Sequence, residues 1–513
     1  MKLHWKVLLW MLAGAVVGLV MQKTLDAPAT AGATWQEVDG GIELVATAKA
    51  GPAVGSKLDI GDVVYGAIRN QGSSDPDRPE ERFEIATVAD FDDVVERSKN
   101  GDVLRLDVRG RPQQMLALSM VSDSPRAKWI YPFSFLADIF MALLKMLIVP
   151  IVFTSITTGV AGVGKLSELR RLGAKTFGYY IATSLLAILV GQALVTTFRP
   201  GDGAQLGLTE LAADEAPDTD PLGILQRIVP ENIVSSMTDN TAMLQVIFFA
   251  LLLGLFITRT PDPYRERILG FFEAFFQVML KMAEGVLSLL PYGVFCLLVR
   301  VVAKTGFAVF EPLLMYMAIV TAALAIHACV TLPIILRVFG RMSPYRWAKA
   351  MSPALITAFS TSSSNLTLPV TLETVEKRGK VSNKITSFTL PLGATINMDG
   401  TALYECIGVI FLAQYYATTS GYELTLGAQG LVVLMALLAS IGAAGIPSAG
   451  LVMMLTILAA LGLPLEGAAL LLAVDRPLDM LRTMVNVWSD SCAAAVIARS
   501  EGEEGPLHAG APG

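Results

Sequence analysis

Long apolar runs alternate with short charged segments along most of this 513-residue chain. They occupy residues 6–21, 133–163, 177–197, 244–257 and 313–336, each near or above the roughly 20 residues that cross a bilayer. The first run is too long for a secretory signal and has no small-residue cleavage site, so we expect a retained helix. We therefore predict an all-α polytopic membrane protein.

Basic residues cluster in alternate connections between these runs. They precede the run at 6–21 and follow the runs at 133–163, 244–257 and 313–336, whereas the intervening connections are acidic or neutral, notably 202–220. Since Lys and Arg stay on the cytoplasmic side, we predict a multi-pass protein of the plasma (bacterial inner) membrane with a cytoplasmic N-terminus. Only 16% of the residues are charged, against about 25% in soluble domains, which agrees with a surface facing lipid.

Residues 35–122 interrupt this pattern with short segments of alternating polarity, which predict strands. The charge asymmetry of the connections places this insert outside the cytoplasm. The stretch Gly51-Pro-Ala-Val-Gly-Ser-Lys-Leu-Asp-Ile-Gly-Asp-Val-Val, a helical pattern over 91–99 and a last strand over 101–109 resemble a PDZ domain. PDZ domains bind peptide ends by strand addition, so the resemblance implies a peptide ligand. The alternative is an inert β-rich cap.

Polar or glycine-rich stretches break three apolar segments of the C-terminal third, at 360–365, 397–400 and 442–450. Irregular backbone at membrane depth is tolerated only where it lines a cavity or meets other protein. Two such breaks in corresponding places favour a transporter site built from paired re-entrant hairpins. The alternative for such breaks is a channel filter.

Five polar residues line one face of the last apolar segment. Asp475, Asp479, Arg482, Asn486 and Asp490 fall at about 0°, 40°, −20°, 20° and 60° around a helix of about 100° per residue. Each charge at bilayer depth costs about 2.5–3.5 kcal/mol on insertion scales, so the stripe is expected to face partners or ligands. The alternative is a salt-bridge ladder between Asp479 and Arg482, which leaves Asn486 and Asp490 without a cation.

The residue types in and near this stripe suit two kinds of ligand. A hard cation such as sodium prefers several oxygens, and Asn397, Asp399, Asn486 and Asp490 supply them. An anionic substrate is bound best by a planar guanidinium, here Arg482, and a substrate ammonium would be held by Asp479.

Four long motifs, at 361–369, 391–404, 440–450 and 475–490, occur in the order typical of one family. Together with the rest of 129–500 and the first helix, they resemble the dicarboxylate/amino acid:cation symporters. The resemblance implies eight transmembrane helices, two re-entrant hairpins, a homotrimer and a core that slides across the membrane. It divides the chain into a first helix (1–30), the insert (35–122), helices two to six (129–340), a transport core (341–500) and a disordered cytoplasmic tail (501–513).

The resemblance also assigns roles to individual positions. It implies a substrate shell of Ser364, Thr401, Ile446, Gly450, Asp479, Arg482, Thr483 and Asn486. It implies three sodium sites: Gly393, Asn397, Asn486 and Asp490; backbone near Thr395, Met398, Ser440, Ile441 and Ala443; and Tyr180, Thr183, Ser184, Asn397 and Asp399.

Having both Asp479 and Arg482 favours glutamate or aspartate as the substrate, because the resemblance links each residue to one group of an acidic amino acid. The alternative is a proton- or sodium-coupled symporter of C4-dicarboxylates. A glutamate at the position of Glu405 implies proton co-transport and potassium counter-transport, and we hypothesise that it carries a proton; the alternative is a neutral acid with a structural role.

One departure and several exclusions complete the sequence analysis. The family's arginine near the site is replaced by Ser362 and Met480, and Arg476 occupies a different position. A net charge of −6 gives no support for nucleic-acid binding. The sequence also lacks the H-E-x-x-H motif of metal-dependent proteases, and we expect that the protein is not an enzyme. A PDZ-containing membrane receptor or protease stays a distant alternative, although the sequence gives no reason to pair His327 as a base with Ser448 as a nucleophile.

Overall fold

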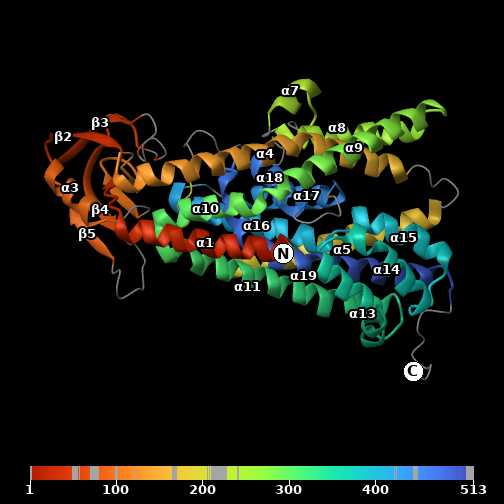
Figure 1. Cartoon of the computed structure of the whole chain (residues 1–513). Helices are drawn as coiled ribbons and strands as arrows, with labels where there is room; N and C mark the ends of the chain where they lie inside the picture. The colour runs from red at the N-terminus through yellow and green to blue at the C-terminus, as the bar shows by residue number, and fades with distance from the viewer. Residues whose placement is uncertain are drawn as a thin grey trace.

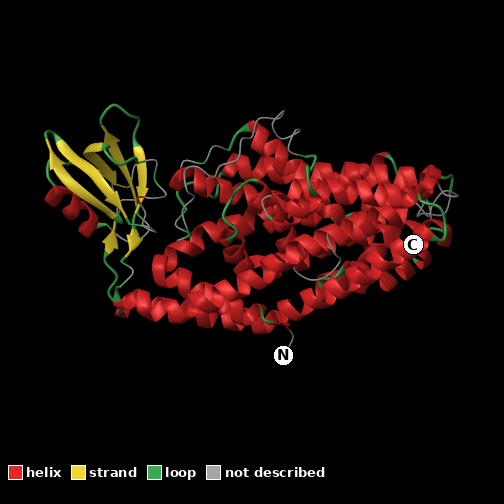
Figure 2. Cartoon of the chain, turned by 90° about the horizontal axis from the view of Figure 1, so that it is seen from above, coloured by secondary structure: helices red, strands yellow, loops and turns green. Residues whose placement is uncertain are grey.

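Helices make up most of the structure, and they run along one long axis with a small β-rich domain at one end (Figure 1 and Figure 2). The computed structural model describes residues 3–48, 53, 56, 58–69, 80–98, 102–121, 123–163, 170–204, 206, 208, 228–239, 242–420, 422, 424–442 and 449–503. The main helices are α1 (Leu3–Thr24), α4 (Pro125–Val163), α5 (Arg170–Phe198), α8 (Met243–Arg259), α9 (Tyr264–Ser288), α10 (Leu290–Thr305), α11 (Phe310–Ile326), α12 (Leu332–Val338), α13 (Pro344–Thr361), α14 (Ser364–Lys377), α15 (Asn383–Ile396), α16 (Asp399–Ser420), α17 (Leu426–Gly442), α18 (Ala449–Ala460) and α19 (Glu466–Ser500).

Several helices suit a membrane. Within the described ranges, four spans are long and apolar enough to cross one: Pro125–Ala161, Arg171–Phe198, Leu290–Val338 and Asn383–Thr419. Shorter apolar helices lie at Leu9–Thr24, Met243–Arg259 and Leu426–Ser440. These helices fit a polytopic membrane protein, and the count of eight stays a prediction.

The helices pack in two groups. In the first, α1 contacts α10, and α4 contacts α8, α9 and α10. In the second, α5, α11, α13, α14, α15 and α16 all contact α19, and α10 of the first group touches α19 as well. Apolar side chains fill the interfaces, with Leu144 and Ile148 of α4 and Leu403 and Ile407 of α16 fully buried. The second group therefore surrounds the helix that carries the polar stripe.

The β-rich domain lies between α1 and α4 in the chain. Its sheet has the order β2-β3-β4-β6-β7, and β5 pairs with β4. The strands are β1 (Ala29–Thr30), β2 (Ala33–Val38), β3 (Gly41–Thr47), β4 (Val63–Arg69), β5 (Glu81–Glu84), β6 (Val103–Val108), β7 (Gln114–Ala117) and β8 (Ser119–Met120), with helix α3 (Val88–Arg97) packed beside them. Strand pairing begins at Ala29, six residues before the predicted boundary, because β1 pairs with β8. The likeness to a PDZ domain stays a prediction.

Three interruptions of the helices position the site. Between α13 and α14, Ser362 adopts a left-handed conformation with φ 51°, and the Ser363 hydroxyl caps α14 by accepting from the Leu366 amide. Between α15 and α16 lie Asn397 and Met398. A π-helical turn over His327–Thr331 separates α11 from α12. Sequence analysis predicted the first two breaks and missed the third.

The first residues of the predicted C-terminal tail contact two other parts of the chain. Glu501 accepts from Lys175 Nζ at 2.6 Å and from Arg171 Nη2 at 2.5 Å. The Ser382 amide donates to Glu503 Oε2 at 3.0 Å. These carboxylates thus join the end of α19 to α5 and to the start of α15, and a disordered tail over 501–513 stays a prediction. Residues 504–513 lie outside the described ranges.

Gly14 and Gly18 allow α1 to approach α10 closely. A Cβ on Gly14 would lie 2.7 Å from the Phe295 carbonyl oxygen, and one on Gly18 would lie 2.8 Å from Val302 Cβ. Small residues spaced by four place both contacts on one helix face, as in helix pairs within membranes. The backbone-to-side-chain contact of the two helices therefore depends on glycine at these positions.

We expect Gly18→Ile to lower the free energy of unfolding by about 1–3 kcal/mol, because the added side chain must separate α1 from α10. Thermal unfolding of the purified protein would measure the change. Val16→Ile is the matched control, since Val16 is 59% exposed on the other face of α1. Equal effects of the two substitutions would contradict the close packing.

Candidate functional site

The site is centred where the interrupted segment between α15 and α16 meets the middle of α19. Asn397 ends α15 with φ −98° and ψ 82°, outside the helical region, and Asp399 begins α16. Backbone groups at such a break are available for other partners, since the helical hydrogen-bond ladder is interrupted there. Both helices contact α19, so these two side chains reach the polar stripe.

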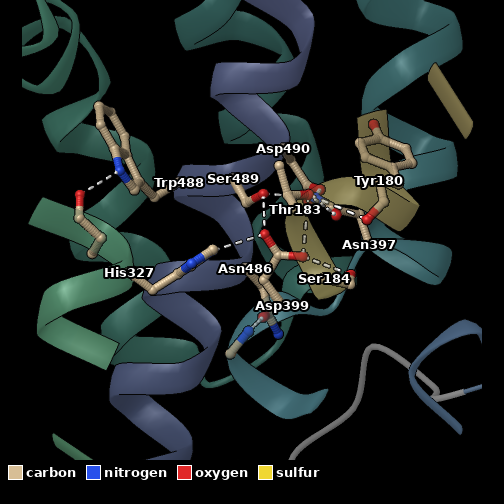
Figure 3. A network of polar contacts seen from close by, with 12 residues as sticks. Tyr180, Thr183, Ser184, His327, Asn397, Asp399, Asn486, Trp488, Ser489 and Asp490 are labelled. Atoms are coloured by element: carbon tan, nitrogen blue, oxygen red, sulfur yellow. Dashed lines mark hydrogen bonds and ion pairs between the residues drawn. The ribbon is translucent and has the colours of Figure 1, made fainter. Parts of the chain in front are cut away.

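Four side chains surround the buried carboxylate of Asp399 (Figure 3). Its Oδ1 accepts from Ser184 Oγ at 2.6 Å and from Thr183 Oγ1 at 3.4 Å. Its Oδ2 accepts from Ser489 Oγ at 2.6 Å and lies 3.0 Å from His327 Nε2. A buried carboxylate is stable only when it is hydrogen-bonded or paired, and these contacts meet that need.

The side chain of Asn397 connects the residues around Asp399 to a second carboxylate, that of Asp490. Its Nδ2 donates to Asp490 Oδ1 at 2.9 Å and to Ser489 Oγ at 3.0 Å, while its Oδ1 accepts from Thr183 Oγ1 at 3.4 Å. Carboxylate, amide and hydroxyl oxygens thus gather from α5, α16, α19 and the break before α16 (Figure 3). Such oxygen-rich groups are what hard cations prefer.

Gly393 allows α15 to lie against Asp490 and Tyr180. A Cβ at Gly393 would lie 2.7 Å from the Tyr180 hydroxyl oxygen and would also meet the Asp490 carboxylate. The Tyr180 hydroxyl donates to the Thr389 carbonyl at 2.7 Å. The structure therefore brings the predicted residues Gly393 and Tyr180 to the Asp490 carboxylate.

Arg482 forms the centre of a separate charged cluster. Its Nη2 donates to Asp475 Oδ1 at 2.9 Å and to Asp479 Oδ1 at 2.8 Å, and its Cζ lies 3.8 Å from the ring centroid of Tyr404. Among the described residues, its buried Nε and Nη1 have no hydrogen-bond partner. A Cβ on Gly450 would lie 2.8 Å from Nη1. This guanidinium can bind an anion such as a carboxylate.

Asn486 links the two parts of the site. Its Oδ1 accepts from the Gly400 amide at 2.8 Å, and its Nδ2 donates to Thr401 Oγ1 at 3.2 Å. Gly400 follows Asp399 directly, and a Cβ on Gly400 would lie 2.8 Å from the Arg482 carbonyl oxygen. A shift at the interrupted segment would therefore be transmitted to the region around Arg482.

Glu405 lies one residue beyond Tyr404 on α16 and is fully buried. Neither of its carboxylate oxygens has a hydrogen-bond partner among the described residues. Burial without partners is costly for the charged form of a carboxylate.

The remaining predicted residues are placed with different precision. Ser364 is buried at the start of α14, and Thr483 Oγ1 donates to the Asp479 carbonyl at 2.8 Å. Met398 and Ser440 are buried, whereas Thr395 is exposed and bonds its own helix. For Ile441 only the backbone is described, and Ala443 and Ile446 lie outside the described residues.

Sequence analysis missed three members of the site and left a fourth, Arg476, without a role. Ser489 falls at about −40° on the helical wheel, next to the stripe, so periodicity could have found it. His327 and Tyr404 lie on other helices, and no local pattern indicates them. Arg476 falls at about 100°, away from the stripe, yet its Nη1 donates to Asp479 Oδ2 at 3.0 Å.

Comparisons with known proteins identify the family. The profile of the sodium:dicarboxylate symporter family matches residues 116–500, about three quarters of the chain. The chain belongs to this family. The match begins within β7 and runs to the end of α19, so it leaves out most of the β-rich domain, and members of the family are transporters rather than enzymes.

Three relatives of this symporter illustrate the likeness. The proton/glutamate-aspartate symporter of Escherichia coli (strain K12) is 38% identical over 374 residues, covering 71% of this chain and 84% of that protein. The proton/sodium-glutamate symport protein of Geobacillus stearothermophilus is 34% identical over 376 residues, covering 72% and 87%. Excitatory amino acid transporter 3 of Homo sapiens is 33% identical over 426 residues, covering 72% and 80%.

We expect Ser489→Ala to destabilise this symporter by about 1–3 kcal/mol, because the buried Asp399 carboxylate loses a donor. Ser491→Ala is the matched control on the same helix; its hydroxyl donates to the Trp488 carbonyl and accepts from Trp347, so its removal should cost about 0.5–1.5 kcal/mol. Denaturant unfolding of both variants tests the difference, and equal losses would contradict a special role for Ser489.

Proposed function

We propose that the chain is a sodium-coupled symporter of acidic amino acids, glutamate or aspartate. The observation that carries this proposal is the buried guanidinium of Arg482, which has N–H groups without partners among the described residues and lies beside Asp479. An anion-binding and a cation-binding group side by side suit a substrate that carries both charges. The names of the relatives, which specify glutamate or aspartate, support the same substrate class.

In this proposal each polar group of the substrate has a partner. Arg482 binds the side-chain carboxylate through Nε and Nη1, and Asp479 holds the ammonium group. Gly450 leaves room beside Nη1, where a side chain would collide. The rest of the shell consists of Ser364, Thr401, Ile446, Thr483 and Asn486. The C4-dicarboxylate alternative offers no ammonium for Asp479.

We assign the oxygen-rich part of the site to co-transported sodium. Asp399, Asn397 and Asp490 lie within one hydrogen-bonded network, with Thr183 and Ser184 beside it. Sodium bound there would fix the interrupted segment, and Asn486 would pass that order to the substrate shell. If bound sodium raises the affinity for substrate by some factor, linkage requires bound substrate to raise the affinity for sodium by that same factor.

The cycle we propose moves the second group of helices against the first. Lys145 of α4 and Glu466 of α19 form an ion pair at 3.5 Å across the two groups, and such a pair must break when they slide. We propose three further features from the resemblance and the charge pattern alone. They are a homotrimer, a cytoplasmic N-terminus and a peptide ligand for the β-rich domain.

We also propose that Glu405 carries a proton with the substrate and takes part in potassium counter-transport. Its burial without a hydrogen-bond partner among the described residues supports a carboxyl group that is neutral when loaded. Its place one residue after Tyr404, which stacks on Arg482, would couple its charge to the occupancy of the guanidinium.

We expect the purified protein in vesicles to concentrate labelled glutamate or aspartate when a sodium gradient is imposed. Arg482→Lys should weaken the apparent affinity at least about tenfold, because an ammonium cannot replace the planar fork. Arg499→Lys, at the end of the same helix, is the control and should transport normally. Absence of sodium-dependent accumulation by the native protein would reject the proposed function.

We expect Glu405→Gln to abolish the rise of uptake with falling external pH and its sensitivity to internal potassium, since an amide carries no proton. Initial rates at several pH values, with and without internal potassium, would show this. Glu373→Gln alters a surface carboxylate paired with Lys377 and serves as the control. An unchanged pH profile in Glu405→Gln would contradict the proposal that Glu405 carries a proton.

A further inference from the structure

Asp479 has two guanidinium partners. Arg482 Nη2 donates to its Oδ1 at 2.8 Å, and Arg476 Nη1 donates to its Oδ2 at 3.0 Å. The carboxylate proposed to hold the substrate ammonium is therefore already shared between two cations in this structure.

The Arg476–Asp479 pair is not an ordinary surface pair of one helix. Lys281 and Glu284 have the same spacing, but their side chains are 76% and 51% exposed. Those of Arg476 and Asp479 are 13% and 7% exposed, and Arg476 Nε is buried without a partner among the described residues. Exposed pairs contribute little, whereas buried ones are strongly felt by neighbouring charges.

The charges around Arg482 balance when Arg476 is included. Asp475 and Asp479 supply two negative charges, and Arg476 and Arg482 supply two positive charges. An arriving ammonium would approach Asp479 where Arg476 already lies, and two cations near one carboxylate repel each other. A dicarboxylate without an amino group would meet no such competition, because Arg476 could stay on Asp479.

We propose that Arg476 occupies on Asp479 the place of the substrate ammonium, and that it thereby sets the selectivity between acidic amino acids and dicarboxylates lacking the amino group. The assignment rests on the proposed function and extends it to a residue outside the substrate shell. Arg476 withdraws from Asp479, or shares it, when an amino acid binds, and remains in place for a dicarboxylate. It acts through Asp479 and is therefore a positioning residue.

The test compares two ligands that differ only in the amino group, aspartate and succinate. Their dissociation constants are measured by calorimetry on the purified full chain in saturating sodium. Arg476→Gln should raise the ratio of the succinate constant to the aspartate constant at least about tenfold, because Asp479 loses a cation that only an ammonium restores. Arg476→Lys keeps the charge and should retain the native ratio.

Arg300→Gln is the matched control. Arg300 on α10 is 15% exposed and pairs with Asp138 at 2.7 Å, so it resembles Arg476 in burial but lies outside the site. Its variant should keep the native ratio. Because both ligands are measured on one protein, a general loss of folded material cancels in the ratio.

Two outcomes are distinguished. If the native chain binds neither ligand in sodium, the proposed function fails. If the native chain binds aspartate but Arg476→Gln leaves the ratio within threefold of the native value, Arg476 has only a structural role and the inference is overturned. A tenfold change in Arg476→Lys would overturn it too, and this arm remains informative where Arg476→Gln does not fold.

Discussion

Charged side chains buried among apolar helices need partners, and the second group of helices is arranged to supply them to α19. Asp475, Asp479, Arg482 and Asp490 are each at most 5% exposed. An unpaired charge in such surroundings would cost more than most single contacts stabilise, so each must meet an opposite charge, a donor or a ligand. The interrupted helices follow from this demand.

The break between α15 and α16 shows how the local backbone geometry supplies partners to the buried charges. A continuous helix would place Asn397 and Asp399 on different faces, whereas the interruption turns both toward α19. Asn397 then donates to Asp490, and Asp399 accepts from Ser489, so both side chains of this short segment bond the C-terminal end of the stripe. Asn486 accepts from the Gly400 amide and lies one helical turn from Arg482 on α19, so it connects the interrupted segment to the surroundings of Arg482.

Periodicity predicted the part of the site that lies on one helix. The stripe on α19 and the interrupted segments could be inferred, because burying polar residues in an apolar run leaves a local signature. His327 could not, since its partner Asp399 is 72 residues away and a π-helical turn alters the helical register there. Tyr404 was missed for the same reason: its contact with Arg482 is made by folding, not by sequence spacing. Strand alternation likewise indicated a β-rich insert, but not the pairing of β1 with β8, because those strands are far apart in the chain.

Stability alone does not account for the cluster around Arg482. Replacing a buried set of ion pairs with apolar residues of similar volume is often neutral or stabilising, so such a set is weak evidence for a structural role. The two carboxylates compensate the charge of Arg482, but they do not use all of its hydrogen-bond donors. Nε and Nη1 have no hydrogen-bond partner among the described residues. A structural ladder would be expected to use those donors. A guanidinium held by two carboxylates, with Nη1 beside Gly450 and Nε also without a partner among the described residues, instead supports the anion-binding role proposed for Arg482.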